Sequence, residues 1–135
     1  MEIIIHTDGG AKGNPGPAAI GIVIEYDGKI KEYGEKIGKA TNNVAEYSAL
    51  IYVLKKTHQL IGEKKSKEAE LKCYSDSELM VKQLKGEYRV KNKDLRKLFL
   101  KILDLIQKFK SVTFHHVLRD KNKRADELLN EAISE

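Results

Sequence analysis

Residues 2–17 read EIIIHTDGGAKGNPGP, and this stretch decides the fold. Its three consecutive isoleucines, Ile3 to Ile5, predict a strand that is buried on both faces, as strands in the parallel part of a sheet are. The apolar run ends at Asp8, just before a glycine-rich segment. Ligands gather at the carboxyl ends of parallel strands, so an acid at this position is a candidate functional residue.

The rest of the chain predicts a mixed α/β sheet. A hairpin signal, Asp27-Gly28, separates two further strands. Strands separated by helices imply right-handed crossovers, and therefore a parallel part with an antiparallel hairpin attached to one edge. The expected elements, in the order β-β-β-α-β-α-α-β-α, are strands at 2–7, 18–26 and 29–37, a helix at 43–58 followed by a charged loop at 62–68, a strand at 70–74, helices at 77–84 and 95–109, a strand at 112–118 and a helix at 122–133.

Length, composition and charge describe an ordinary globular chain. With 135 residues, 41% hydrophobic and 33% charged, we expect one domain spanning 1–135. The net charge of +5 favours nucleic acid or another polyanion as a partner. Cys73 is the only cysteine, which excludes an internal disulfide and a thiolate metal cluster. No apolar run approaches the roughly 18 residues that span a bilayer, so we expect a cytoplasmic protein without membrane contact.

Four acidic residues lie in four separate short motifs, and each has an ordinary structural explanation. An acid before glycines suits a turn. An acid near a helix start suits a capping box, with Asn43 or Ser75 as the capping residue. An acid further into a helix suits a solvated ion pair. The four are Asp8 in HTDGG, Glu46 in NNVAEY, Asp76 in YSDS and Asp126 in RADEL.

The joint arrangement of these acids favours a metal site. Two of them are predicted to end buried strands and two to open helices, which are the places where one fold brings distant carboxylates together. Clustered carboxylates repel one another unless a cation neutralises them. Hard divalent cations prefer oxygen ligands, and a pair of ions flanking a phosphate needs about this many carboxylates.

From Ile3 to Ala132 the chain resembles the ribonuclease HI family, the type 1 ribonucleases H. Four motifs carry the resemblance, in the family's order and with the expected elements between them. They are TDGG with GNPG at 7–16, TNN-x-x-E at 41–46, SDS at 75–77 and N-x-x-x-DEL at 122–128. The resemblance implies a ribonuclease H-like fold with a five-stranded mixed sheet flanked by helices.

The resemblance also implies an activity. Asp8, Glu46, Asp76 and Asp126 match the family's catalytic, metal-binding quartet, which holds two Mg²⁺ ions, with Mn²⁺ as the alternative. The implied reaction is endonucleolytic hydrolysis of the RNA strand of an RNA–DNA hybrid, giving 3′-hydroxyl and 5′-phosphate ends. The hybrid is the implied partner of a monomer that requires no protein partner. The positions that match substrate contacts are Gly9, Gly10, Asn14, Thr41 and Asn43.

Two departures from the family place the chain in a short subgroup. The loop at 118–124 holds no histidine, and Arg119 is the residue that we expect to supply positive charge near the phosphate. The family's Trp-containing basic protrusion is also missing, because 86–93 connects two helices directly. His116 is interpreted as a packed strand residue. The alternatives are an inactive nucleic-acid-binding module, a related exonuclease or resolvase, and a sugar-kinase-like protein.

Overall fold

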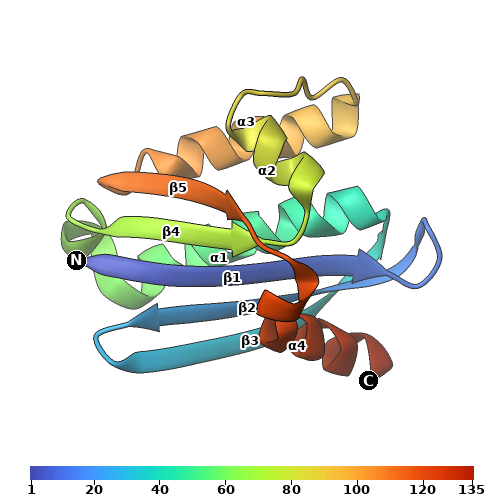
Figure 1. Cartoon of the computed structure of the whole chain (residues 1–135), viewed down its shortest axis with the longest axis horizontal. Coiled ribbons are helices and arrows are strands. Elements are labelled where there is room, and N and C mark those ends of the chain that lie inside the picture. Colours follow the sequence, from blue (N-terminus) through green and yellow to red (C-terminus); the bar gives the residue numbers. More distant parts are fainter.

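A computed structural model describes residues 1–135, and its five strands form one mixed sheet in the order β3-β2-β1-β4-β5 (Figure 1). The pairs β1–β2 and β2–β3 are antiparallel, whereas β1–β4 and β4–β5 are parallel. The expected order of elements and the mixed sheet are confirmed. None of the helices is both long and apolar enough to span a membrane. The elements are β1 (Glu2–Ala11), β2 (Gly16–Tyr26), β3 (Lys29–Ala40), α1 (Asn42–Ser66), β4 (Glu70–Ser75), α2 (Glu78–Leu84), α3 (Lys93–Ile106), β5 (Ser111–His116), the 3-10 turn η1 (Arg119–Lys121) and α4 (Lys123–Ser134).

Helices cover both faces of the sheet. α1 packs on β1 and β2, and α3 packs on α1, so these two helices form a layer on one face. α4 packs on β2 and β3 from the other face (Figure 1). β2 is therefore buried on both sides: Ile20, Ile22 and Ile24 belong to the main core, whereas Ala19 packs with Leu129 of α4. This arrangement places the start of α4 over the middle of the sheet.

β1 continues beyond its predicted end at Thr7. Its parallel pairing with β4 stops at the Thr7–Ser75 pair, but its antiparallel pairing with β2 runs on to the Ala11–Ala18 pair. The glycine-rich segment is therefore strand rather than loop as far as Ala11, because β2 supplies hydrogen-bonding partners that override the weak strand preference of glycine. Asp8 lies inside β1, one residue past the last pair that β1 forms with β4.

α1 is also longer than predicted. The expected charged loop at 62–68 is wrong, since helical backbone resumes after Gly62 and ends at Ser66. Gly62 alone is non-helical, with φ of 84° and ψ of 168°, values that glycine adopts without a steric penalty. The Ser66 hydroxyl donates a hydrogen bond to the Gly62 carbonyl at 2.7 Å. Charged residues are good helix formers, so a run of them does not by itself predict a loop.

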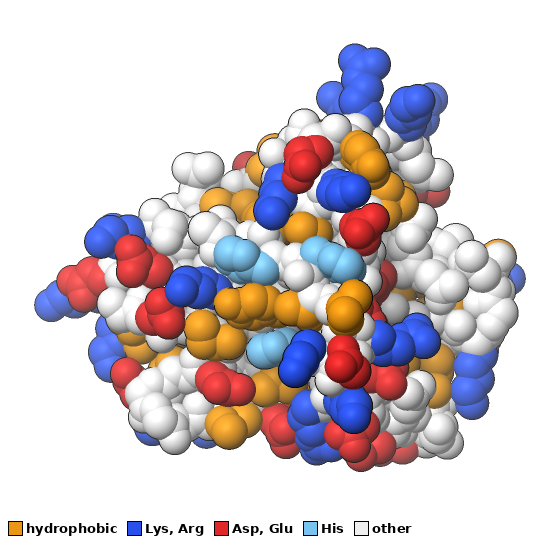
Figure 2. Space-filling model, in the orientation of Figure 1, with side chains coloured by type: hydrophobic (Ala, Val, Ile, Leu, Met, Phe, Trp, Pro, Cys, Tyr) orange, Lys and Arg blue, Asp and Glu red, His pale blue; other side chains and the backbone are white.

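Three aromatic rings form a row on the face of the sheet that α4 covers only in part. His6 stacks on Tyr74 with ring centroids 5.2 Å apart, and Tyr74 stacks on His115 at 5.0 Å. These residues alternate along their strands with members of the main core, so the rings lie on the opposite side of the sheet. Figure 2 shows histidine and hydrophobic side chains across the middle of this face, with basic side chains protruding above the segment that joins α2 and α3.

Candidate metal centre

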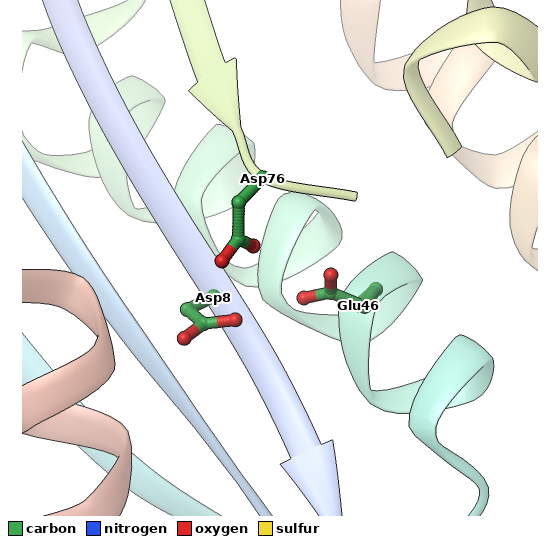
Figure 3. A group of neighbouring side chains, drawn as sticks. All are labelled: Asp8, Glu46 and Asp76. Carbon is green, nitrogen blue, oxygen red and sulfur yellow. The ribbon is translucent and has the colours of Figure 1, made fainter. Parts of the chain in front are cut away.

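The ends of two neighbouring parallel strands bring Asp8 and Asp76 together. Asp76 follows the last residue of β4, and Asp8 follows Thr7, which pairs with Ser75. Parallel neighbours present equivalent positions at the same edge, so the two side chains emerge side by side. Figure 3 shows the carboxylate of Asp76 directed toward Asp8, with the carboxylate of Glu46 approaching from α1. The inference that two acids meet beyond the β1–β4 pairing is confirmed, although β1 itself continues.

Glu46 does not cap its own helix. The N-cap of α1 is Thr41, whose hydroxyl accepts a hydrogen bond from Val44 N–H at 3.2 Å, so a capping box built on Asn43 is wrong. Glu46 lies beyond the first turn, and its Oε1 accepts a hydrogen bond from Gly9 N–H at 2.5 Å. The carboxylate of α1 is thus fixed to the backbone of β1 beside Asp8.

Gly9 allows α1 to approach β1 this closely. A Cβ at Gly9 would overlap the backbone carbonyl of Ala45 and lie 2.6 Å from Glu46 N. Backbone atoms cannot yield as the end of a flexible side chain does, so only glycine fits here. The Gly9 N–H also donates to Asp8 Oδ1 at 2.9 Å, which connects two of the acids through one backbone group.

Asp76 likewise plays no capping role. The N-cap of α2 is Ser77, which accepts from Met80 N–H at 3.3 Å, so the proposed capping box from Ser75 to Glu78 is wrong. Ser75 instead accepts from Ser77 N–H at 3.0 Å and shapes the short turn that holds Asp76. The carboxylate of Asp76 remains free to face the other acids.

Asp126 reaches the same place from α4. It lies in the first turn of that helix and lines the same cleft, close enough to Asp8 for its charge to raise the pKa of Asp8. The alternative role of Asp126, a helix residue paired with Lys123 or Asn122, is wrong, because its half-buried side chain lines the cleft instead. The nearby cation Arg124 pairs instead with Glu32 of β3, with Nε 2.7 Å from Oε2. All four candidate acids thus meet around Asp8.

The arrangement offers only oxygen ligands. Asp8, Glu46 and Asp76 each present a carboxylate oxygen, and these three atoms lie within 4.8 Å of one another. They line an open cleft of about 680 Å³, to which Asp126 also contributes. A set made only of carboxylates fits a hard divalent cation such as Mg²⁺ or Mn²⁺ rather than a thiolate-preferring metal.

Burial and mutual repulsion perturb two of these acids. Burial, together with the charges of Asp76 and Asp126, raises the pKa of Asp8 from 3.8 to about 7. The pKa of Glu46 is also raised, first by burial and then by the charges of Asp8 and Asp76. Repulsion of this kind is relieved by a bound cation. The donor set therefore fits a divalent metal on electrostatic grounds as well.

The raised pKa of Asp8 predicts how stability depends on pH without metal. Between pH 4 and 7 the unfolded chain releases the Asp8 proton while the folded protein retains it, so rising pH favours unfolding through this group. We expect the melting temperature in EDTA of wild type, relative to that of Asp8→Asn, to fall between pH 5 and pH 8. A difference that stays constant across this range would contradict the prediction.

The six candidate substrate-contact residues fall into two neighbouring places. Gly9, Gly10 and Arg119 line the cleft of the acids, and Arg119 Nε lies 3.8 Å from Asp76 Oδ2. Asn14 and Thr41 line a separate depression of about 230 Å³, and Asn43 lines both. Two of these residues also have structural roles: Thr41 caps α1, and Asn14 Oδ1 accepts a hydrogen bond from Asn42 N–H at 3.0 Å.

Sequence reasoning missed two residues at the cleft. Asn42 was quoted only as part of a motif, yet its Oδ1 accepts from Ala11 N–H at 2.9 Å and ties α1 to the end of β1. His116 was interpreted as a packed or hydrogen-bonded strand residue. It does lie in β5, but it is not packed: its side chain is 33% exposed on the cleft wall, with Nδ1 3.9 Å from Glu78 Oε2. Asn42 had a signal, since it stands beside the expected Asn43.

Comparison with known proteins agrees with this geometry. The family described as "Reverse transcriptase-like" matches residues 6–132. The ribonuclease H of Francisella philomiragia is 31% identical, covering 99% of this chain and 92% of the relative. A crystal structure of LC11-RNase H1 in complex with an RNA/DNA hybrid has a TM-score of 0.91 at 47% identity, covering 98% of this chain and 96% of that one.

The fold and the carboxylate cluster thus define a protein with ribonuclease H architecture. The chain belongs to the ribonuclease H family. It is also 38% identical to a bifunctional protein of Mycobacterium tuberculosis over 98% of its own length, but it spans only 36% of the length of that relative.

Proposed function

We propose that this protein is an endonuclease that hydrolyses the RNA strand of RNA–DNA hybrids, leaving 3′-hydroxyl and 5′-phosphate ends, with two Mg²⁺ ions as cofactors and Mn²⁺ as the alternative. The observation that carries the proposal is the convergence of four carboxylates, from β1, α1, the end of β4 and α4, on one open cleft. The similarity to a protein solved with an RNA/DNA hybrid supports the choice of substrate.

In this proposal Asp8, Glu46, Asp76 and Asp126 hold the metal ions. Bound ions would lower the pKa of an attacking water and stabilise charge on the leaving 3′ oxygen. Asp8 has a central part, because the other three acids surround it. Glu46 contributes a carboxylate whose orientation is fixed before any ligand arrives, since Gly9 N–H already holds it. Such preorganisation avoids a reorganisation cost during the reaction.

Recognition of the RNA strand is assigned to the backbone beside the acids. RNA differs from DNA by its 2′-hydroxyl, which both donates and accepts hydrogen bonds. Glu46 and the backbone around Gly9 and Gly10 match the family positions that read this group, and all three residues line the cleft. Gly10 lines the cleft, and an added Cβ there would have no neighbour nearer than 3.6 Å. We assign Asn14, Thr41 and Asn43, in and beside the second depression, to the nucleic-acid backbones, and Arg119 to a phosphate.

Glu46→Gln separates catalysis from binding. We expect turnover to fall by at least about 100-fold, as for other groups that act on charge in the transition state, while the Kd for the hybrid changes little. The amide keeps an oxygen that accepts from Gly9 N–H, and it removes a charge that burial and Asp8 disfavour, so the metal-free melting temperature should not fall. Glu63→Gln, on the exposed far end of the same helix, is the matched control. Wild-type turnover in Glu46→Gln would refute the assignment.

The activity itself is tested with labelled RNA–DNA hybrid, double-stranded RNA and double-stranded DNA, each incubated with Mg²⁺, with Mn²⁺ and with EDTA. We expect cleavage of the hybrid with either ion, none with EDTA, and no cleavage of double-stranded DNA. Analysis of the product termini should show 3′-hydroxyl and 5′-phosphate groups. Binding of the hybrid without cleavage under every condition would support the alternative, an inactive nucleic-acid-binding module.

A further inference from the structure

Asn122 is a buried polar side chain that joins two distant parts of the chain. It stands between η1 and α4 and is only 2% exposed. Its Nδ2 donates a hydrogen bond to the carbonyl oxygen of Thr7 at 2.8 Å, across 115 positions of sequence. Because the residue is buried, substrate cannot touch it directly. Its contribution must pass through the groups that it contacts.

Both ends of this connection adjoin a carboxylate of the metal centre. Thr7 immediately precedes Asp8 on β1. The backbone carbonyl of Asn122 accepts a hydrogen bond from Asp126 N–H at 3.2 Å. Two hydrogen bonds therefore connect the backbone next to Asp8 to the backbone of Asp126, through Asn122 alone. Arg124, in the first turn of α4, also reaches the sheet, but it binds Glu32 of β3 and not the backbone beside Asp8.

The second polar atom of the Asn122 side chain has no partner. Its Oδ1 is buried without a hydrogen bond, whereas nearly all buried polar atoms in proteins are paired. An unpaired buried oxygen is unfavourable for folding. The amide therefore has one favourable role at this position, the donation from Nδ2 to Thr7, which indicates that the link to β1 is what the residue provides.

Two glycines of the sheet, Gly21 and Gly34, allow close contact between the backbone of α4 and the strands beneath it. Gly21 of β2 is the register partner of Asp8, and a Cβ there would overlap the Ala125 carbonyl and lie 2.8 Å from Leu129 N. Gly34 of β3, the next register partner, would place a Cβ 2.6 Å from the Leu128 carbonyl oxygen. The two glycines let the backbone of α4 rest on the sheet. This close contact sets the distance between α4 and the sheet, and the hydrogen bond from Asn122 sets the position of α4 along β1.

We propose that Asn122 is a positioning residue. Together with the close contact at Gly21 and Gly34, it holds Asp126 beside Asp8 and thereby sets the metal affinity of the site. The proposal rests on the assignment of Asp8 and Asp126 as metal ligands under the proposed function. Asn122 forms no part of the ligand set itself. Mutation of residues that orient metal ligands in this way typically lowers metal affinity by about 10- to 100-fold.

Asn122→Ala tests the proposal, first without substrate. Calorimetric titration of the protein with Mn²⁺ should show binding weakened by about 10-fold or more, the range typical of such orienting residues. In hybrid cleavage we expect kcat to fall by a similar factor, with KM within about two-fold of wild type because Asn122 has no surface for substrate to contact. Raised metal concentration should restore part of the activity. Unchanged Mn²⁺ affinity would overturn the proposal.

A matched control separates positioning from simple loss of stability. Thr57 of α1 is also fully buried, and its hydroxyl donates to a backbone carbonyl, that of Val53, at 2.7 Å. Thr57→Val removes a comparable hydrogen bond far from the acids. Both variants should lower the melting temperature by several degrees. Only Asn122→Ala should change Mn²⁺ affinity and kcat, and equal effects of the two variants would identify Asn122 as structural.

A double-mutant comparison identifies the partner through which Asn122 acts. If its role is to hold Asp126, then Asn122→Ala should add little to the loss of Mn²⁺ affinity already caused by Asp126→Asn. Losses that multiply would contradict this. Should Asn122→Ala fail to fold, Asn122→Ser takes its place, and failure of both would show a purely structural role. Wild-type protein that binds Mn²⁺ but leaves the hybrid intact would refute the proposed function and leave the metal-binding comparison valid.

Discussion

Asp8→Asn is expected to reduce cleavage of the hybrid by at least about 1000-fold, which corresponds to roughly 4 kcal/mol of lost transition-state stabilisation. Asp8 is the acid that all three others surround, so its charge is the one that the whole site shares. Asparagine keeps the size of the side chain and an oxygen that accepts from Gly9 N–H, so the fold should be preserved. Steady-state kinetics at saturating Mg²⁺ measures the effect.

The same variant should be more stable than wild type when metal is absent. A carboxylate whose pKa is raised to about 7 is disfavoured in its charged form, and each pKa unit corresponds to about 1.4 kcal/mol. Thermal melts in EDTA at pH 8 should therefore show a higher melting temperature for Asp8→Asn, and added Mg²⁺ should stabilise wild type more than the variant. Asp104→Asn, an exposed change on α3, should alter neither stability nor turnover. Near-normal cleavage by Asp8→Asn would remove the basis of the metal site.

Gly9→Ala is expected to damage both the fold and the site. The new methyl group would overlap the Ala45 carbonyl, so β1 and α1 must separate. Forcing atoms into a packed contact costs about 1–3 kcal/mol and more where backbone must move. We expect a loss of at least about 3 kcal/mol in the free energy of unfolding. The separation also breaks the hydrogen bond from Gly9 N–H to Glu46, so the remaining folded protein should turn over poorly.

Gly10→Ala is the matched control for the stability effect. A Cβ at Gly10 would meet only the side chains of Leu129, at 3.6 Å, and Asn42, at 3.9 Å, which are ordinary van der Waals distances. We expect its free energy of unfolding to lie within about 1 kcal/mol of wild type, as for most substitutions that create neither cavity nor clash. Urea titrations of both variants, read by circular dichroism, give the comparison. Equal stability of Gly9→Ala and wild type would show that α1 does not depend on this close contact.

The order of the elements was predictable because it depends on local patterns. Alternating or continuous apolar residues mark strands, and apolar residues at helical spacing mark helices, wherever the rest of the chain lies. The Asp27-Gly28 turn is one such signal: both residues have positive φ, 50° and 70°, as a tight hairpin requires. The predicted ends of β1 and α1 were wrong. Pairing with β2 extends β1 beyond its predicted end, and Gly62 interrupts α1 without ending it.

The four acids were also identified in the sequence, but their roles could not be read there. Capping boxes for Glu46 and Asp76 fitted the local spacing and are absent, since Thr41 and Ser77 cap the helices. A motif states only which residues stand three or four positions apart. Whether a carboxylate turns back to its own helix or across to another element depends on what lies opposite. For Glu46 that partner is Gly9 N–H, 37 positions away.

The sequence by itself therefore determined which elements form, in which order, and which acidic side chains are the candidates for the chemistry. Tertiary structure decided how those side chains meet. It ended the β1–β4 pairing beside Asp8, brought the backbone of α4 against two glycines of the sheet, and connected Asn122 to Thr7. The physical reason is range. Periodicity and turn preferences act over a few residues. The raised pKa of Asp8 and the position of Asp126 arise instead from burial and from contacts between residues far apart in the sequence, which exist only once the chain has packed.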